Sequence, residues 1–319
     1  MRRIAVLAVT VLLLAVAGCT TDDKKADSAG TKVGLGVIPI VDVAPVYLGK
    51  SKGFFSRRGI DLNLVQEQGG PAIVKGVLAG TYEFGFSNVT SLMAAEAGDL
   101  PLRAVANGVA STGRPYRDFS AIVVPYGSPI RSPAELAGKK VAVNALKSLG
   151  DTTVRESVRK AGGDPAGIKF KAMPFPTMPS ALQAGGLDGA WMVEPQLSEA
   201  ITLGAQVVAS NFVDTAPDLT VAMYFTASGL IDRDPQLVAR FTEAVKESLA
   251  YAATHPDEVR DAVGTYTAIS DTVRISMALP NWPDTINRPS LERLSLLGQR
   301  DGIFTRPPAL DKLLPAAGP

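Results

Sequence analysis

A short stretch in the first third of the chain recurs in altered form further along. Residues 79–86 (AGTYEFGF) are echoed by residues 184–191 (AGGLDGAW). In both copies a glycine that can end a helix is followed by an acidic residue and a run of small and aromatic residues typical of a strand. The separation is too long for a solenoid repeat, and the alternative is chance similarity in a chain with 30 glycines. Taken as a repeat, the echo predicts two lobes built on one plan.

Short apolar runs alternate with amphipathic stretches along the whole body of the chain. This alternation predicts an α/β fold of mainly parallel sheets flanked by helices. The first part predicts strands over 33–38, 61–66 and 83–86, and helices over 44–51, 72–79 and 88–97. Further along we expect strands over 140–143 and 168–172, and helices over 152–161, 177–184, 235–254 and 290–298.

Two apolar segments, 121–125 and 221–226, flank the middle block and are predicted to be the crossings between the lobes. The block itself opens with Ser132, Pro133 and Glu135, a pattern typical of a capping box at a helix start. These boundaries predict one lobe from residues 32–124 and 225–319, and a second lobe from residues 125–224.

The N-terminus has the composition of an export signal. Arg2 and Arg3 precede an apolar run over 4–16, which is too short to span a bilayer comfortably. The run ends in VAGC, which resembles a bacterial lipobox, and Cys19 is the only cysteine of the chain. We therefore expect a signal peptide over 1–18, then a lipidated Cys19 and a flexible polar tether over 19–31. The alternative is an ordinary secretory signal with an incidental cysteine. Lipidation would hold the protein on the outer side of the cell membrane.

Charge and histidine content exclude several classes of function. The formal net charge of +1 argues against nucleic acid as a partner. The single histidine, His255, stands beside Pro256 at a predicted helix boundary, where we expect a surface or capping role. A zinc site would need three or four His, Cys or carboxylate ligands, and a serine–histidine triad would have to use His255 itself. We expect no metal, no cofactor and no catalysis, and a monomer. Carboxylate chemistry on the same fold remains an alternative.

Ligands of open α/β sheets bind beyond the carboxyl ends of the strands. Two such lobes would place their strand ends around one cleft. The candidate ligand-binding residues are those that follow the predicted strands: Ile40, Asp42, Gly69, Ser87, Asn88, Ser148, Leu149, Gly150, Asp151, Thr152, Phe175, Trp191 and Glu194.

Several of these candidates could have either a ligand-binding or a purely structural role. Ser87, Asn88 and residues 148–152 precede helices, where free backbone N–H groups can bind polar ligand groups, but the same residue types are ordinary helix caps. Trp191 could stack on a flat ligand or pack in the core. Glu194 could accept hydrogen bonds from a ligand or act as the first-turn acid of a helix.

Four ordered motifs resemble the substrate-binding proteins of ABC importers, in the nitrate, sulfonate, taurine and thiamine-pyrimidine group, also called NMT1/THI5-like. They are APVYLGKSKGFF at 44–55 with GIDL at 59–62, LAG and EFG at 78–80 and 83–85, SPAELAGKKVAV at 132–143, and WMVEP at 191–195. The match extends beyond HPDE at 255–258.

The resemblance implies a two-lobed periplasmic-binding-protein fold with two crossing strands. It also implies capture of a small solute and its delivery to a membrane permease; an extracellular sensor is an alternative. The pyrimidine synthases of this fold use a Cys-rich motif that this chain lacks. Asp42 and Glu194 near the cleft favour a pyrimidine or thiamine precursor over an aliphatic sulfonate, although both remain candidates.

Overall fold

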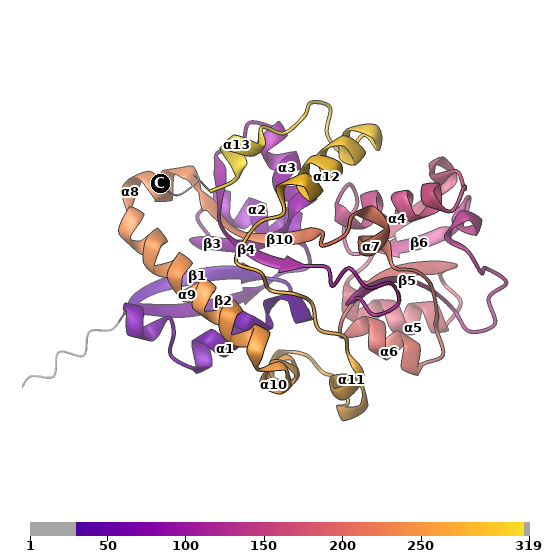
Figure 1. Ribbon diagram of the computed structural model, residues 1–319, viewed down its shortest axis with the longest axis horizontal. Coiled ribbons are helices and arrows are strands. Elements are labelled where there is room, and N and C mark those ends of the chain that lie inside the picture. The colour runs from indigo at the N-terminus through magenta and orange to yellow at the C-terminus, as the bar shows by residue number, and fades with distance from the viewer. Residues whose placement is uncertain (1–29, 316–319) are drawn as a thin grey trace, which may run out of the picture.

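The computed structural model describes residues 30–315, which form two lobes side by side (Figure 1). Each lobe contains one five-stranded sheet. The expected signal peptide, the lipidation site Cys19 and the tether up to residue 29 lie outside the described residues. Thr31, which the sequence assigned to the tether, belongs to the first strand. No helix within residues 30–315 is long and apolar enough to cross a membrane.

The sheet of lobe 1 has the strand order β2-β1-β3-β10-β4. Its parallel strands β1, β2 and β3 are joined by β10, which runs antiparallel to both β3 and β4. Apolar residues fill both faces of β3 and β10, as expected of strands covered by helices on each side. The bounds are β1 Thr31–Val37, β2 Ile60–Gln66, β3 Phe84–Asn88, β4 Leu102–Ala110 and β10 Thr220–Ala227.

The sheet of lobe 2 repeats this plan in the order β7-β6-β8-β5-β9. Here β6, β7 and β8 are parallel, and β5 is the antiparallel strand between β8 and β9. The echoed stretches lead into β3 and β8, which hold the same central place in the two sheets, so the predicted repeat is confirmed. The bounds are β5 Ser120–Val124, β6 Lys140–Val143, β7 Lys169–Ala172, β8 Gly189–Val193 and β9 Gln206–Ala209.

The changes of sheet occur earlier than the sequence suggested. The strand β5 pairs within lobe 2 and β10 within lobe 1, so neither strand itself crosses. The crossing segments are residues 111–119 and 216–219, which connect β4 to β5 and carry the chain from α7 to β10. By sheet membership, residues 120–124 therefore belong to lobe 2 and residues 220–224 to lobe 1. The apolar patterns of β5 and β10 marked central antiparallel strands rather than linkers.

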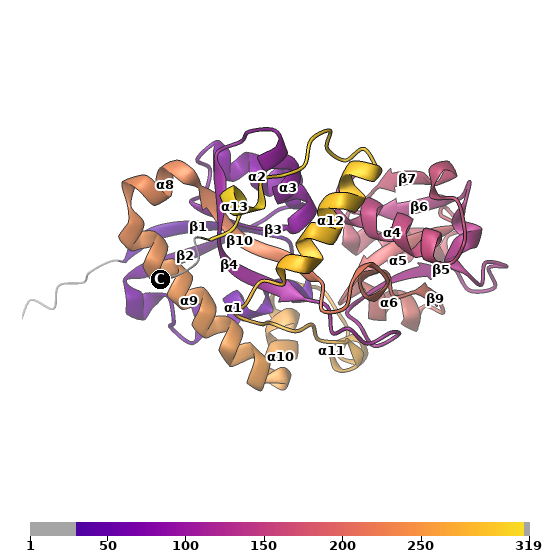
Figure 2. The same cartoon turned by 45° about the horizontal axis from the view of Figure 1, so that its top comes forward.

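Helices cover both faces of each sheet (Figure 2). In lobe 1, α1, α9 and α10 lie on one side of the sheet, and α2, α3, α12 and α13 on the other (Figure 1). The bounds are α1 Ala44–Ser51, α2 Gly70–Leu78, α3 Val89–Ala97, α4 Leu149–Lys160, α5 Met178–Gln183, α6 Gln196–Thr202, α7 Asn211–Thr215, α8 Ser228–Arg233, α9 Pro235–Thr254, α10 Pro256–Tyr266, α11 Asp271–Ser276, α12 Arg288–Arg300 and α13 Leu310–Leu313.

Local signals set several of these ends. Asp234 caps α9 by accepting a 2.9 Å hydrogen bond from the Leu237 amide, and His255 occupies the junction of α9 and α10 as predicted. The Ser132 motif opens only a short 3-10 turn over Pro133–Leu136, not the start of a long helix. Its Glu135 accepts from the Arg131 amide and not from that of Ser132, so the predicted capping box does not close.

A third link between the lobes comes from the C-terminal part of the chain. Residues 277–287, the strap, run between α11 and α12 (Figure 1). Asn281 of the strap pairs with Ala110 at the end of β4. Beyond the strap, Arg293 of α12 lies 2.5 Å from Glu156 of α4, which belongs to lobe 2. The C-terminal segments therefore hold both lobes.

The aromatic contact between α9 and the lobe 1 sheet provides a stability test. The ring of Phe241, fully buried, stacks on Phe84 with the ring centroids 3.7 Å apart. We expect Phe241→Ala to lower the free energy of unfolding by about 3 to 5 kcal/mol, because it leaves a cavity in the core. Denaturant unfolding measures the change. Tyr126→Ala, at a side chain that is 81% exposed, is the control and should cost little. Equal losses in both variants would contradict this account of the core.

Candidate ligand-binding site between the lobes

The carboxyl ends of the parallel strands from both lobes meet at one boundary. After β3, Ser91 Oγ lies 3.0 Å from Oγ of Ser148, the residue that precedes α4 in lobe 2. The Ser148 hydroxyl also lies 3.4 Å from Asn88 Oδ1. After β1, the Val41 amide donates to the Glu194 carbonyl oxygen at 3.0 Å. The structure thus brings together strand-end residues that are far apart in the sequence.

Close approach at this boundary explains one glycine of the site. A Cβ at Gly70 would stand 2.4 Å from Ser87 Oγ and 2.7 Å from Asn88 Nδ2. Asn88 also caps α3, because its Oδ1 accepts from the Ser91 amide at 2.9 Å. The capping alternative is therefore correct for Asn88, while its amide group still faces the boundary.

Of the twelve buried side-chain polar atoms without a hydrogen-bond partner among the described residues, six belong to residues that follow these strands. Among the described residues, nothing donates to or accepts from Asp42 Oδ1, Thr90 Oγ1, Asn144 Oδ1, Asp151 Oδ1, Thr152 Oγ1 or Gln196 Oε1. These atoms follow β1 and β3 of lobe 1 and β6 and β8 of lobe 2. An unsatisfied buried polar group costs about 1 to 3 kcal/mol, and native proteins keep such groups few. A cluster drawn from both lobes is the arrangement that a polar molecule held between them would satisfy.

Asp42 belongs to the lobe 1 set and lies in the short 3-10 turn Val41–Val43 after β1. Its side chain is 2% exposed, and burial raises the pKa of its carboxyl to about 7, with the nearby Asp118 charge acting in the same direction. Tyr266 donates to the carbonyl oxygen of Ile40 at 2.9 Å and Trp282 to that of Asp42 at 3.3 Å. These bonds hold the turn after β1 in place while leaving Asp42 Oδ1 free.

Asp151 lies in the first turn of α4 on the lobe 2 side. Its Oδ2 accepts from the Lys147 amide at 2.9 Å, while Oδ1 is buried without a partner among the described residues. Burial raises the pKa of Asp151 to about 6, against the opposing effects of that hydrogen bond and of the Arg155 charge. Asp42 and Asp151 thus place one carboxyl oxygen from each lobe at the boundary, each able to accept a hydrogen bond.

Glu194 has a different position from the one expected of a ligand-contacting residue. Its carboxylate accepts from the Ser198 amide at 3.0 Å, from the Ser198 hydroxyl at 2.9 Å and from the Ala278 amide of the strap at 3.1 Å. Burial raises its pKa to about 7. Because all these partners are protein groups, Glu194 joins β8, α6 and the strap, as the helix first-turn alternative implied.

Trp191 packs in the core, which was the second of its two predicted roles. Its indole N–H donates to Ser120 Oγ at 2.8 Å, and its ring lies edge-on to Phe175 and Phe212. A Cβ at Gly150 would stand 2.4 Å from the indole, so the glycine lets the start of α4 rest on the ring. Trp191 therefore supports the residues that line the boundary and does not line it. Leu149 is likewise buried.

A cavity of about 240 Å³ opens between the lobes on the side away from the crossing segments. Ile40 and Phe175, both predicted, line it together with Gln66, Glu67 and Gln68. Gly69 follows directly and faces Asn144, whose Nδ2 would be 3.2 Å from a Cβ at that glycine. This cavity marks the accessible edge of the boundary.

The sequence analysis missed Asn144, Gln196 and Ser91. Asn144 directly follows β6 and could have been found by the same strand-end rule. Gln196 and Ser91 lie inside the first turns of α6 and α3, where the sequence gives no signal of a binding role. Within residues 30–315 no group of three or more His, Cys, Asp or Glu is placed to hold a metal ion.

Two of the buried carboxyls with raised pKa values, those of Asp42 and Glu194, give stability a definite pH dependence. Between the ordinary carboxyl range and about pH 7, folded protein retains protons on Asp42 and Glu194 that unfolded protein has released. The free energy of unfolding should therefore fall as pH rises through that window, by up to about 1.4 kcal/mol per pH unit for each group.

We expect Asp42→Asn and Glu194→Gln each to flatten this slope, as measured by denaturant unfolding from pH 4 to pH 8. The exposed Asp284→Asn is the control and should keep the wild-type slope. Wild-type slopes in both buried-site variants would refute the assignment.

Comparison with known proteins identifies the family. The model of the NMT1/THI5-like family matches residues 40–259. A candidate aliphatic sulfonates-binding protein of Bacillus subtilis is 24% identical over 278 residues, which cover 85% of this chain and 79% of that protein. A candidate binding protein of Brucella abortus is 24% identical over 226 residues, covering 70% of this chain and 67% of that protein.

Solved structures share the fold at low sequence identity. The ligand-binding component of an ABC-type import system of Staphylococcus aureus superposes with a TM-score of 0.76 at 18% identity, covering 89% of this chain and 96% of that one. The periplasmic aliphatic sulphonate binding protein of Escherichia coli gives a TM-score of 0.69 at 16% identity, with 90% and 92% covered. The chain therefore belongs to the NMT1/THI5-like family and has the two-lobed periplasmic-binding-protein fold.

Proposed function

We infer that this protein is the solute-binding component of an ABC importer. It captures a small organic solute between its lobes, leaves it chemically unchanged and presents it to the permease. The observation that carries this proposal is the set of unpartnered buried polar atoms contributed by both lobes. Family membership and the fold support the same conclusion.

A site shared between lobes couples binding to lobe closure. Asp42 and Thr90 come from lobe 1, and Asn144, Asp151 and Thr152 from lobe 2. A solute that touches both sets binds the closed arrangement better than an open one, and this difference shifts the population toward closure. The crossing segments are the natural hinge for that motion. The permease would then recognise the closed form.

The chemistry of the unpartnered atoms favours a solute that donates hydrogen bonds. Carboxyl oxygens of Asp42 and Asp151 can accept, and the threonine hydroxyls can do either. Of the two basic residues nearest Asp151 in sequence, Lys147 is exposed, and Arg155 donates to the Pro165 carbonyl oxygen and lies over the Phe170 ring. An N–H-bearing heterocycle such as a pyrimidine or thiamine precursor fits this set better than an aliphatic sulfonate, because an anion beside two buried carboxyls would be repelled.

A binding screen tests the solute class. We expect neutral or cationic pyrimidines to raise the melting temperature, since a ligand that binds only folded protein stabilises it. Sulfonates and nitrate should have no effect. Stabilisation by sulfonates alone would reject the proposed solute class, and a lack of response to any small solute would count against the binding function.

Variants then test the site with whichever solute binds. Asp151→Asn, Thr152→Val and Asn88→Ala should each weaken binding about tenfold, because each removes a hydrogen-bonding group at the boundary. Thr254→Val, at an exposed helix end, is the matched control and should bind as the wild type does. Isothermal titration calorimetry measures the affinities. Unchanged affinity in all three site variants would show that the solute binds elsewhere.

We also propose that the protein works outside the cytoplasm as a monomer anchored by lipid at Cys19. The export-type N-terminus and the lipobox-like VAGC support this proposal. Replacing the thiol removes the atom to which an acyl group would be attached. Cys19→Ser should therefore move the protein from the membrane fraction to the soluble extracytoplasmic fraction on immunoblots. Retention of the variant on membranes, or of labelled fatty acid by it, would overturn the anchor.

A further inference from the structure

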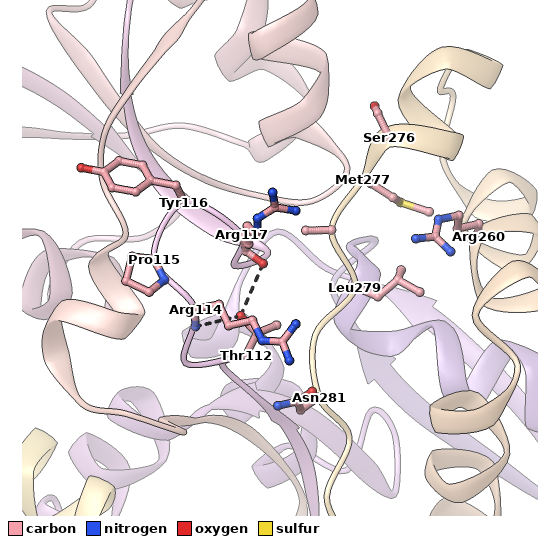
Figure 3. Close-up of a pocket in the computed structure, with 11 residues that line it drawn as sticks. Thr112, Arg114, Pro115, Tyr116, Arg117, Arg260, Ser276, Met277, Leu279 and Asn281 are labelled. Carbon is pink, nitrogen blue, oxygen red and sulfur yellow. Dashed lines mark hydrogen bonds between the residues drawn. The ribbon is translucent and has the colours of Figure 1, made fainter.

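A second and larger cavity lies at the hinge. Its volume is about 800 Å³, and it is open to solvent and bordered by the crossing segment 111–119, helix α10 and the strap (Figure 3). The crossing segment supplies Arg114 and Arg117, and α10 supplies Arg260. It lies beside β4, β5 and the strap, whereas the 240 Å³ cavity lies by β2 and β7 at the opposite edges of the sheets.

Of the residues that the structure describes, three arginines and no acidic residue line this space. Figure 3 shows Arg114 and Arg117 on one side of the strap and Arg260 on the other. Within residues 30–315, neither Arg114 nor Arg117 forms an ion pair. Arg260 donates to the Pro256 carbonyl oxygen at 3.3 Å, and its one ion pair within residues 30–315 is a 3.7 Å contact with Asp257, whose side chain is 98% exposed. Its Nε is buried and has no partner among the described residues.

The acidic groups nearby do not neutralise these arginines. Asp118 directs its oxygens inward, where they accept from the Ser111 hydroxyl and from the amides of Thr112 and Phe119. Asp261 is engaged by Arg274. The lining therefore carries three positive charges, two of them on the exposed side chains of Arg114 and Arg117. Guanidinium groups carry planar sets of donors that match the oxygens of phosphate and carboxylate groups.

We propose that this hinge cavity is a second binding site, which takes a small multiply charged oxyanion of the phosphate class. The hinge cavity offers hydrogen-bond donors, whereas the solute boundary offers mainly acceptors. The two sites therefore select different molecules. The anion would join the crossing segment to α10 beside the strap. The strap in turn reaches the solute boundary through the hydrogen bond from the Ala278 amide to Glu194.

Calorimetric titration of the full chain with inorganic phosphate and with pyrophosphate, in low-salt buffer and without solute, tests this site. We expect saturable binding at one site, tighter for pyrophosphate and weakened by added salt. Arg117→Gln and Arg260→Gln should each lower the affinity about tenfold, because each removes a charge-assisted donor set.

Two controls keep the result specific. Arg233→Gln, at an exposed arginine at the end of α8, changes the net charge equally and should bind the anion as the wild type does. Asp151→Asn, at the solute boundary, should also leave anion binding unchanged. No saturable binding to the wild type would overturn the proposal. So would wild-type affinity in both cavity variants, provided that their melting temperatures show them folded, or an equal loss in Arg233→Gln.

Discussion

The burial of polar strand ends without protein partners is the constraint on which the rest of this structure depends. Parallel strands must end somewhere, and here the ends of both sheets meet at one boundary and lose contact with water. Such burial is unfavourable unless something supplies the missing hydrogen bonds. A solute of the proposed kind, bound between the lobes, would supply these hydrogen bonds and so stabilise their closed arrangement. That dependence is what makes a binding protein responsive to its solute.

Glu194 connects this boundary to the hinge. Its carbonyl oxygen accepts from Val41 of lobe 1, while its carboxylate accepts from α6 of lobe 2 and from the strap. A single buried residue thus joins both lobes and the segment that borders the arginine-lined cavity. Any movement of one lobe against the other must stretch or exchange these bonds. These contacts make Glu194 a positioning residue, because it holds Val41, α6 and the strap in place.

Much of the fold follows from local sequence, and less of the site does. Helix α1 and strand β6 coincide with their predicted bounds, because a Pro-containing apolar start and a compact apolar run identify them clearly. The prediction that β5 and β10 are the crossings between the lobes was wrong, because a buried strand has the same apolar pattern in whichever sheet it pairs. The strand-end rule located Asp42 and Asp151. It could not predict that the Trp191 N–H donates to Ser120, or that the strap donates a hydrogen bond to the Glu194 carboxylate. Those outcomes depend on contacts between residues far apart in sequence.

The place of β10 in lobe 1 has a consequence for how the chain acquires its shape. Strands β3 and β4 are close in sequence, but they do not pair; β10 lies between them and is made only after all of lobe 2. Until it arrives, the first sheet has two open edges facing a gap one strand wide, and open edges invite association with other chains. The five strands of lobe 2, by contrast, all come from one continuous stretch of the chain, residues 120–209. Lobe 2 can therefore complete its sheet first, whereas the sheet of lobe 1 is complete only when β10 is inserted.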